Sequence, residues 1–327
     1  MRPIALCLTS LAAVTIPMGA AELRISGPYA HENLAIYLVH GPDRVQKDYL
    51  TLAEAIEQRK VVVHETSDVN RLQVENLSGQ DVYIQSGEIV KGGKQDRVLS
   101  EDLILPTSSG KVNIKAFCVE QGRWTQRGRE SVQAFAAAPS AIATPELKRA
   151  VRQVASQRAV WTEVSAAQDR LAVTLGAPVK SVASESSYQL SLEAPKVQQR
   201  ADRFKKALLG LAGRHSDALG YVMAVNGKVT GADLYASHAL FSKLWPKLLD
   251  AAAVEAMALV RPAGTTAMPR MEDVRAAASG NGARVSSEVQ INRRTTGTKA
   301  DLPGGLVFET RDTEAPTVTL HRSYLAK

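Results

Sequence analysis

Cysteine is nearly absent from this chain, with only Cys7 and Cys118 among 327 residues. The N-terminus has the pattern of a secretory signal, because Arg2 precedes an apolar stretch over residues 4–16 and small residues follow at 19–21. Cleavage of a signal peptide over residues 1–21 would remove Cys7 and leave one thiol, which excludes an internal disulfide in the mature chain. We therefore expect a periplasmic or secreted protein. The alternative is a cytoplasmic protein whose first strand is apolar.

Long apolar runs, aromatic residues and clustered histidines are also lacking. Beyond the leader no stretch approaches the roughly 18 apolar residues of a membrane-spanning helix, so we expect no transmembrane segment. Aromatic residues make up 5% of the chain, which disfavours a base-stacking surface, and we expect no nucleic acid partner. The histidines are scattered, so we predict no metal and no cofactor. A G-x-S-x-G nucleophile elbow is absent as well.

The charge of the chain is positive and unevenly distributed. The net charge is +7, and residues 145–215 hold 12 Lys and Arg against 6 Asp and Glu. A basic helical face can attract an anionic lipid or another partner, but most such faces are only solvated surface. The sequence leaves the oligomeric state open.

The pattern of apolar residues predicts an α+β protein. We expect a β-rich N-terminal domain over residues 22–133, an Ala/Pro linker over 134–143, a segment of long helices over 144–215, and a mixed C-terminal region of hairpin, helix and strands over 216–327 that packs with it. Thr51 opens a short helix in the first domain. The turn at 77–80 predicts that the strands 72–76 and 81–85 form a hairpin. Further strands are expected at 34–39, 61–64, 98–105 and 112–119.

The helices and strands of the second half have clearer signals. Thr144-Pro145-Glu146 predicts a helix start, with apolar spacing that continues through Trp161 and Val164. A second helix is expected over residues 196–212. Asn226-Gly227 is the strongest short-range signal for a hairpin. Pro246 lies inside the helix that Ser237 caps, so we expect a kink or a restart there. Strands are expected at 285–291, 306–310 and 317–320.

Two polar clusters, each after a strand-like run, predict a binding site. In the stretch 87–97 the paired glycines allow backbone amides to surround an anion, and neighbouring cations would reinforce that site. It is no phosphate-binding P-loop, because Gly93 stands where the lysine is required. The alternative is a tight polar turn in which Glu88 and Asp96 pair with the cations. The ligand-binding residues that we predict are Lys91, Gly92, Gly93, Lys94, Gln95, Arg97, Arg123 and Trp124.

Three residues of these clusters are candidates for catalysis. Glu88 and Glu120 would act as acid and base if the two loops adjoin. Cys118 and Arg123 flank four residues, as the cysteine and arginine do in rhodanese-like loops, where the arginine stabilises a thiolate. Because Cys118 lies within the apolar run A-F-C-V, the alternative is a core cysteine.

These motifs resemble a bacterial family, the ARG-and-rhodanese-phosphatase-superfamily-associated protein domain. The matching blocks are G-E-I-V-K-G-G-K-Q-D-R-V-L at 87–99, F-C-V-E-Q-G-R-W at 117–124, Y-V-M-A-V-N-G-K-V-T-G-A-D-L-Y at 221–235 and L-F-S-K-L-W-P-K-L-L at 240–249. The resemblance implies no particular activity. The family's genomic neighbours suggest ADP-ribose or phosphoryl chemistry, which is an association and not a mechanism. Nucleotides are scarce outside the cytoplasm, so export would favour a different ligand.

Our leading hypothesis is an exported protein whose loops 87–97 and 118–124 form one pocket for a small anionic ligand, phosphate-like or nucleotide-sugar-like. The first alternative is an enzyme, either a hydrolase that uses Glu88 or Glu120 or a thiol enzyme that uses Cys118. The second alternative is an interaction module of the cell envelope whose basic helices over 145–215 face a partner or lipid.

Overall fold

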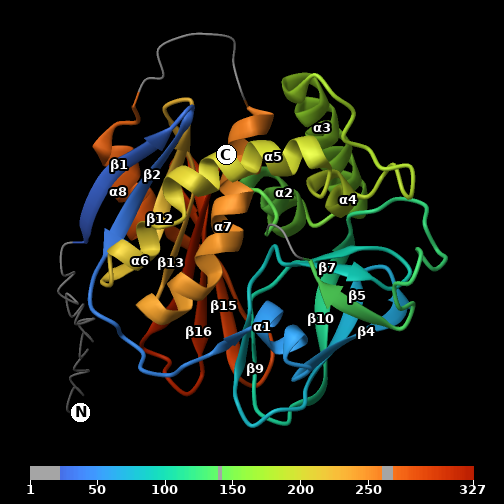
Figure 1. Cartoon of the computed structure of the whole chain (residues 1–327). Helices are drawn as coiled ribbons and strands as arrows, with labels where there is room; N and C mark the ends of the chain where they lie inside the picture. The colour runs from blue at the N-terminus through green and yellow to red at the C-terminus, as the bar shows by residue number, and fades with distance from the viewer. Residues whose placement is uncertain (1–22, 139–141, 260–267) are drawn as a thin grey trace, which may run out of the picture.

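The chain folds into a large antiparallel sheet beside a closed β-barrel, with helices on and between them (Figure 1). The structure is a computed structural model that describes residues 23–138, 142–259 and 268–327. The predicted α+β class is confirmed. The leader at 1–21 and residues 139–141 of the predicted linker lie outside the described residues.

The large sheet combines strands from both ends of the chain. Asn226 and Gly227, with φ of 52° and 75°, form the predicted hairpin turn between β12 and β13. β2 pairs with β12, so the N-terminal strands belong to a sheet completed by the last third of the chain. The strand order is β1 (Arg24–His31), β2 (Leu34–His40), β12 (Ala218–Val225), β13 (Lys228–Tyr235), β17 (Thr319–Ala326), β16 (Gly305–Asp312), β15 (Thr295–Leu302) and β14 (Arg284–Gln290).

Both faces of this sheet are covered, because successive side chains of a strand point to opposite faces. On β2, Ile36 packs in the core beneath α7 (His238–Ala258), and its neighbour Tyr37 packs toward α8 (Met271–Ser279) on the other face. Ser237 caps α7 as predicted. The helix does not restart at Pro246, but continues through it to Ala258.

The barrel contains strands that lie far apart in the sequence. Its order is β10 (Gly110–Cys118), β5 (Arg71–Asn76), β4 (Val61–Asp68), β11 (Ala134–Ala137), β7 (Ile89–Gly92) and β8 (Arg97–Leu99). Residues 134–137 are therefore not a linker. They form β11, which pairs with β4 on one side and with β7 on the other. Phe135 of this strand packs in the hydrophobic core of the barrel.

The predicted hairpin between residues 72–76 and 81–85 is wrong. β5 pairs with β4 and β10, whereas β6 (Val82–Ile84) pairs with β3 (Leu50–Thr51) and β9 (Leu103–Leu105) in a separate small sheet. The side chain of Asn76 donates to the carbonyls of Gln80 and Pro106, at 2.8 and 2.9 Å, and so fixes a turn that leads the chain out of the barrel. Beside this sheet lies α1 (Leu52–Glu57), which Thr51 caps as predicted.

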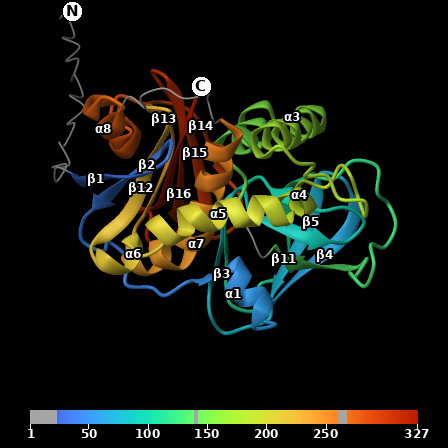
Figure 2. The same ribbon diagram turned by 45° about the horizontal axis from the view of Figure 1, so that its top comes forward.

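Helices connect the barrel to the sheet. They are α2 (Pro145–Arg149), a π-helical turn (Ala150–Val154), α3 (Gln157–Leu175), α4 (Tyr188–Leu192), α5 (Pro195–Leu208) and α6 (Leu211–Arg214). The first predicted helix is interrupted at Ala155, where φ is 50° and the backbone is left-handed. Val154 is consequently exposed, and Trp161, which lies on the apolar face of the predicted helix, is only partly buried. Figure 2 shows α5 running across the molecule from α6 to α4.

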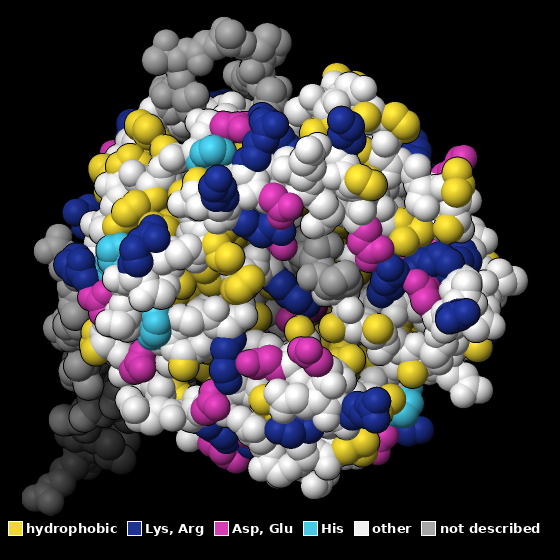
Figure 3. Space-filling model, in the orientation of Figure 1, with side chains coloured by type: hydrophobic (Ala, Val, Ile, Leu, Met, Phe, Trp, Pro, Cys, Tyr) yellow, Lys and Arg dark blue, Asp and Glu magenta, His cyan; other side chains and the backbone are white. Residues whose placement is uncertain are grey.

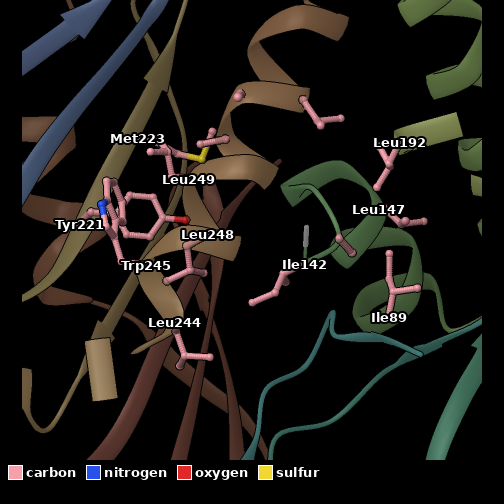
Figure 4. Packing of buried hydrophobic residues seen from close by; sticks show 14 of the residues in the cluster. Ile89, Ile142, Leu147, Leu192, Tyr221, Met223, Leu244, Trp245, Leu248 and Leu249 are labelled. Carbon is pink, nitrogen blue, oxygen red and sulfur yellow. The ribbon is translucent and has the colours of Figure 1, made fainter. Parts of the chain in front are cut away.

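One hydrophobic core extends from the sheet to the outside of the barrel. Trp245 of α7 is buried against Tyr221 of β12, with ring centroids 5.4 Å apart. Figure 4 shows the two sides of this core: on the sheet side Tyr221, Met223, Leu244, Trp245, Leu248 and Leu249, and facing them Ile89, Ile142, Leu147 and Leu192. The barrel and the sheet are thus packed as one body, and polar groups between them are buried.

Candidate functional site

The two predicted loops lie against each other at one end of the barrel. Arg123 donates to the carbonyls of Gly93 and Gly92, at 3.1 and 3.0 Å. In the other direction, the amide of Asp96 donates to Glu120 Oε2 at 3.0 Å. Loops 87–97 and 118–124 therefore form one structural unit, although β8, β9 and β10 lie between them in the sequence.

Two backbone amides of the glycine loop donate to carboxylates of the chain itself. The amide of Gly92 donates to Asp96 Oδ1 and that of Lys94 donates to Glu65 Oε2, both at 3.0 Å. A Cβ built on Gly93 would lie 2.2 Å from the Phe135 ring, so packing alone requires glycine there. The backbone amides that could receive an anion already bind internal ones.

A buried group of charges holds this unit together, and we call it the arginine–carboxylate cluster: Asp96, Glu120, Arg123, Arg127 and Glu130. Arg127 binds Asp96 at 2.8 Å and Glu120 at 3.0 Å, and both carboxylates are fully buried. Burial raises the pKa of Asp96 despite the hydrogen bonds from Arg127. Burial also acts on Glu120, but hydrogen bonds from Arg123 and from other donors outweigh it, and the pKa of Glu120 lies below its usual value.

Lys91, Lys94 and Arg97 also have partners within the chain, whereas the buried side-chain oxygen of Gln95 and Nε of Arg97 have no hydrogen-bond partner among the described residues. Lys91 pairs with Glu193 at 2.7 Å, and the ammonium of Lys94 donates to Ser67 at 2.9 Å. Arg97 is buried and donates to the carbonyl of Gln95 at 2.8 Å. Trp124, at 48% exposed, covers no core. Anion binding at these loops stays a prediction, and it would have to compete with carboxylates that are already in place.

Glu88 does not lie with Glu120. It belongs to a second buried group between the large sheet, the small sheet and α7. We call this group the central polar cluster, and its members are Tyr83, Gln85, Glu88, Asp102, Lys148, Tyr221, Asp233, Tyr235, Lys247 and His321. The sequence pattern identified only Glu88.

The centre of this cluster is an imidazole held between two carboxylates. His321 Nδ1 is 2.8 Å from Asp102 Oδ2, and its Nε2 is 3.0 Å from Asp233 Oδ1. Burial lowers the pKa of His321, but the two carboxylates outweigh burial and raise it above its usual value. Burial raises the pKa of Asp102, whereas His321 outweighs that effect and holds the pKa well below its usual range. The three groups are therefore an imidazolium between two carboxylates.

Aromatic rings and hydroxyls fix the imidazolium in place. The Tyr235 ring stacks on His321 with centroids 4.7 Å apart, and its hydroxyl donates to Gln85 Oε1 at 2.7 Å. The Tyr221 hydroxyl donates to Asp233 at 3.3 Å. Burial raises the pKa of both phenols well above the usual value. The tyrosines are thus hydrogen-bond donors here and not acids.

One side of the cluster has unused hydrogen-bonding capacity. Glu88 accepts from Lys247 at 3.2 Å through Oε2, while its buried Oε1 has no partner among the described residues. Lys148 donates to Asp233 at 3.4 Å, and a Cβ built on Gly87 would lie 2.8 Å from Lys148 Cε. Lys148 therefore packs directly against the residue that precedes Glu88. Figure 3 shows the face of the molecule seen in Figure 1, where basic and acidic side chains lie around the centre of the view.

The sequence of this chain matches the model of one protein family. The model of the ARG and Rhodanese-Phosphatase-superfamily-associated Protein domain matches residues 22–324. The chain belongs to this family. No curated protein and no solved structure matches it. The resemblance read from the motifs is confirmed, and in this family member both buried clusters lie within the matched residues.

Cys118, the single cysteine among the residues that the structure describes, is buried in the barrel wall. Gln157 bonds both the amide and the carbonyl of Cys118, at 2.9 and 2.8 Å. Burial raises the pKa of the Cys118 thiol to about 11. A thiol with this pKa is protonated at neutral pH, and the thiolate is the nucleophilic form. The structure therefore offers no activation of Cys118.

Two further features of this family member bear on what it can bind. Among the residues that the structure describes, no group of His, Cys, Asp and Glu is arranged to hold a metal ion. None of the described helices is long and apolar enough to cross a membrane.

Proposed function

We propose that this member of the family binds a small anionic ligand of the phosphate or sugar-phosphate class at the central polar cluster, where the loop 87–97 begins. The observation that carries the proposal is the unpartnered Oε1 of Glu88, a buried carboxylate oxygen. Buried polar atoms almost always have a hydrogen-bond partner, so an open one indicates a missing donor. A ligand hydroxyl is such a donor.

Two lysines near Glu88 are the reason for proposing an anionic ligand. Lys148 and Lys247 are largely buried, and each ammonium is engaged by one carboxylate, Asp233 and Glu88 respectively. An ammonium has three N–H donors, so both lysines keep donors for further acceptors. Phosphate oxygens are strong acceptors for such charged donors. Because His321 is held between its carboxylates, it would stabilise the site without taking part in binding.

Thermal unfolding in the presence of ligands tests this proposal. The panel contains inorganic phosphate, ribose 5-phosphate, ADP-ribose and the matching unphosphorylated sugars. A ligand at 100-fold excess over its Kd should raise Tm by roughly 5 °C. Glu88→Gln and Lys148→Met should abolish that increase. Lys115→Met, in an exposed ion pair with Glu101, is the matched control and should retain it.

The loop variants Lys94→Ala and Trp124→Ala separate the two candidate locations. If they abolish the Tm increase and Glu88→Gln does not, the ligand binds at loops 87–97 and 118–124, and the central cluster is only structural. No Tm increase with any compound would contradict a small anionic ligand at either location.

We also propose that the chain is exported, on the basis of the leader pattern and because the family match begins at residue 22, directly after the predicted cleavage site. The full chain expressed in a Gram-negative host should be recovered from the periplasm or medium with Glu22 as its first residue. Deletion of residues 2–21 should keep it in the cytoplasm. N-terminal sequencing of fractionated cells measures this, and an uncleaved cytoplasmic chain would contradict export.

A further inference from the structure

A serine, a histidine and a carboxylate are aligned at one end of the large sheet. Ser26 lies on β1, His40 ends β2, and Asp217 immediately precedes β12. Ser26 Oγ is 2.6 Å from His40 Nε2, and His40 Nδ1 is 2.9 Å from Asp217 Oδ1. Hydrolytic triads have the same order of contacts, with the hydroxyl on one ring nitrogen and the carboxylate on the other. We propose that these three residues form a nucleophilic site that hydrolyses small carboxylic esters.

The backbone holds the three residues in this arrangement. The strands β1, β2 and β12 are neighbours, and the amide of Gly41 donates to the carbonyl of Asp217 at 3.0 Å, which fixes the ends of β2 and β12 together. β1 has an irregular register between Ser26 and Tyr29. Gly27 within it has φ of 110°, and a Cβ there would lie 2.8 Å from the carbonyl of Ile36. Irregularities of this kind are over-represented next to active sites, where they re-aim side chains.

The charges suit the assigned roles. His40 is buried, at 2% exposed, whereas Ser26 is partly exposed and accessible. The hydrogen bond from His40, together with the ion pair to Arg24, holds the pKa of Asp217 below its usual value. Asp217 is therefore ionised at neutral pH and can orient His40 and stabilise its imidazolium form.

A surface pocket of about 390 Å³ adjoins the histidine and the carboxylate. Leu23, Pro42 and Leu219 give it an apolar wall. Arg44 gives it positive charge, whereas the charge of Arg24 is paired with Asp217. Arg44 forms no ion pair among the described residues. The pocket thus suits a short acyl group, and more so one with a terminal carboxylate.

The reaction follows from these positions. The ester carbonyl carbon accepts a bond from Ser26 Oγ while His40 Nε2 takes the hydroxyl proton. The bond to the alcohol oxygen then breaks, and His40 gives that proton to the leaving alcohol. Water attacks the acyl-serine, passes a proton to His40, and releases the carboxylic acid and free Ser26. The Tyr29 hydroxyl lies 3.2 Å from Ser26 Oγ and 3.0 Å from His215 Nε2, and it would donate to the developing oxyanion.

The chain contains a natural comparison pair. Ser242 Oγ is 2.9 Å from His238 Nε2, and His238 Nδ1 is 2.8 Å from the carbonyl of Ala218 and not from a carboxylate. This pair lacks the third member, so Ser242 should not act as a nucleophile. Ser242→Ala is the matched control for Ser26→Ala.

The experiment treats the purified full chain with a fluorophosphonate probe, which reacts with activated serines, and maps the label by peptide mass spectrometry. Hydrolysis of p-nitrophenyl acetate and mono-p-nitrophenyl succinate is measured in parallel. We expect the label on Ser26, its loss in Ser26→Ala, and its retention in Ser242→Ala. Asp217→Asn should lower kcat by roughly 100-fold or more with little change in KM, and Asp217→Glu should recover part of that loss.

Other results overturn the assignment. A wild-type chain that takes no label and hydrolyses neither ester has no nucleophilic site here. A label or hydrolysis that persists in a folded Ser26→Ala variant places the activity elsewhere. Lys115→Met, in an exposed ion pair with Glu101, should leave labelling of Ser26 unchanged. Labelling of Ser26 needs no ligand at the central polar cluster, so this proposal and that of the central polar cluster fail independently.

Discussion

Replacing Arg127 by alanine should lower the free energy of unfolding by about 3–5 kcal/mol, because it leaves two buried carboxylates without their shared counter-charge. Asp96 and Glu120 both bind Arg127 within 3.0 Å and have no exposed surface. Arg123 remains bonded to Glu120 and lies 3.7 Å from Asp96, so it compensates only in part. Chemical denaturation, followed by the unfolding midpoint at constant m-value, measures the change.

The exposed neighbour Arg129 provides the control, and Arg129→Ala should change stability by less than about 0.5 kcal/mol. The cost of Arg127→Ala should also shrink as pH falls, because the stranded carboxylates can then take up protons. A loss below about 1 kcal/mol at neutral pH would contradict the view that this cluster holds the two loops together.

Replacing Glu255 by glutamine should stabilise the protein above pH 8, by roughly 4–5 kcal/mol. Glu255 of α7 is buried, and it lies near Glu146 and Glu163, which bind the same arginine, Arg170, at 2.7 and 2.6 Å. Burial, and then the two neighbouring carboxylates, raise the pKa of Glu255 from 4.5 to about 8. Glutamine keeps the shape of the protonated acid and cannot ionise.

The sign of the pH dependence follows from the raised pKa of Glu255. Between pH 4.5 and 8 the folded chain keeps a proton on this residue that the unfolded chain releases. This contribution to stability is fully present below pH 4.5, is lost as the pH rises toward 8, and stays constant above it. The wild type and Glu255→Gln should therefore have similar Tm at pH 5 and diverge as pH rises. Equal slopes of Tm against pH in the two proteins would rule out a raised pKa, and the exposed Glu272→Gln should behave as wild type.

Local features of the fold were predictable because they depend on neighbouring residues. The Asn226-Gly227 turn and the Thr51 and Ser237 caps are each set by residues within a few positions of one another. Polar residues placed after strand-like runs suggested loops 87–97 and 118–124 as one pocket, but whether the two loops adjoin stayed open. The internal partners of these loops could not be predicted, because Arg127 and Glu65 lie outside both motifs. Only the folded barrel shows that Arg127 binds Asp96 and Glu120 and that Glu65 accepts from the amide of Lys94.

The central polar cluster could not be predicted, because no motif encodes it. His321 and Asp102 are 219 positions apart, and each stands alone among apolar or ordinary polar residues. The same holds for Ser26 and Asp217, which meet His40 only through the order of β1, β2 and β12. Strand order also explains an error of the prediction. Residues 134–137 were predicted as part of a linker, because their pairing with β4 and β7 cannot be seen in the sequence.

The pairing of β2 with β12 affects the time at which the protein can fold. Residues 34–40 pair with β1, but they acquire their second sheet neighbour only when residues 218–225 have been made. At a synthesis rate of about 5–20 residues per second, the first two strands wait roughly ten to forty seconds for that neighbour. The large sheet therefore cannot be completed until most of the chain has been made.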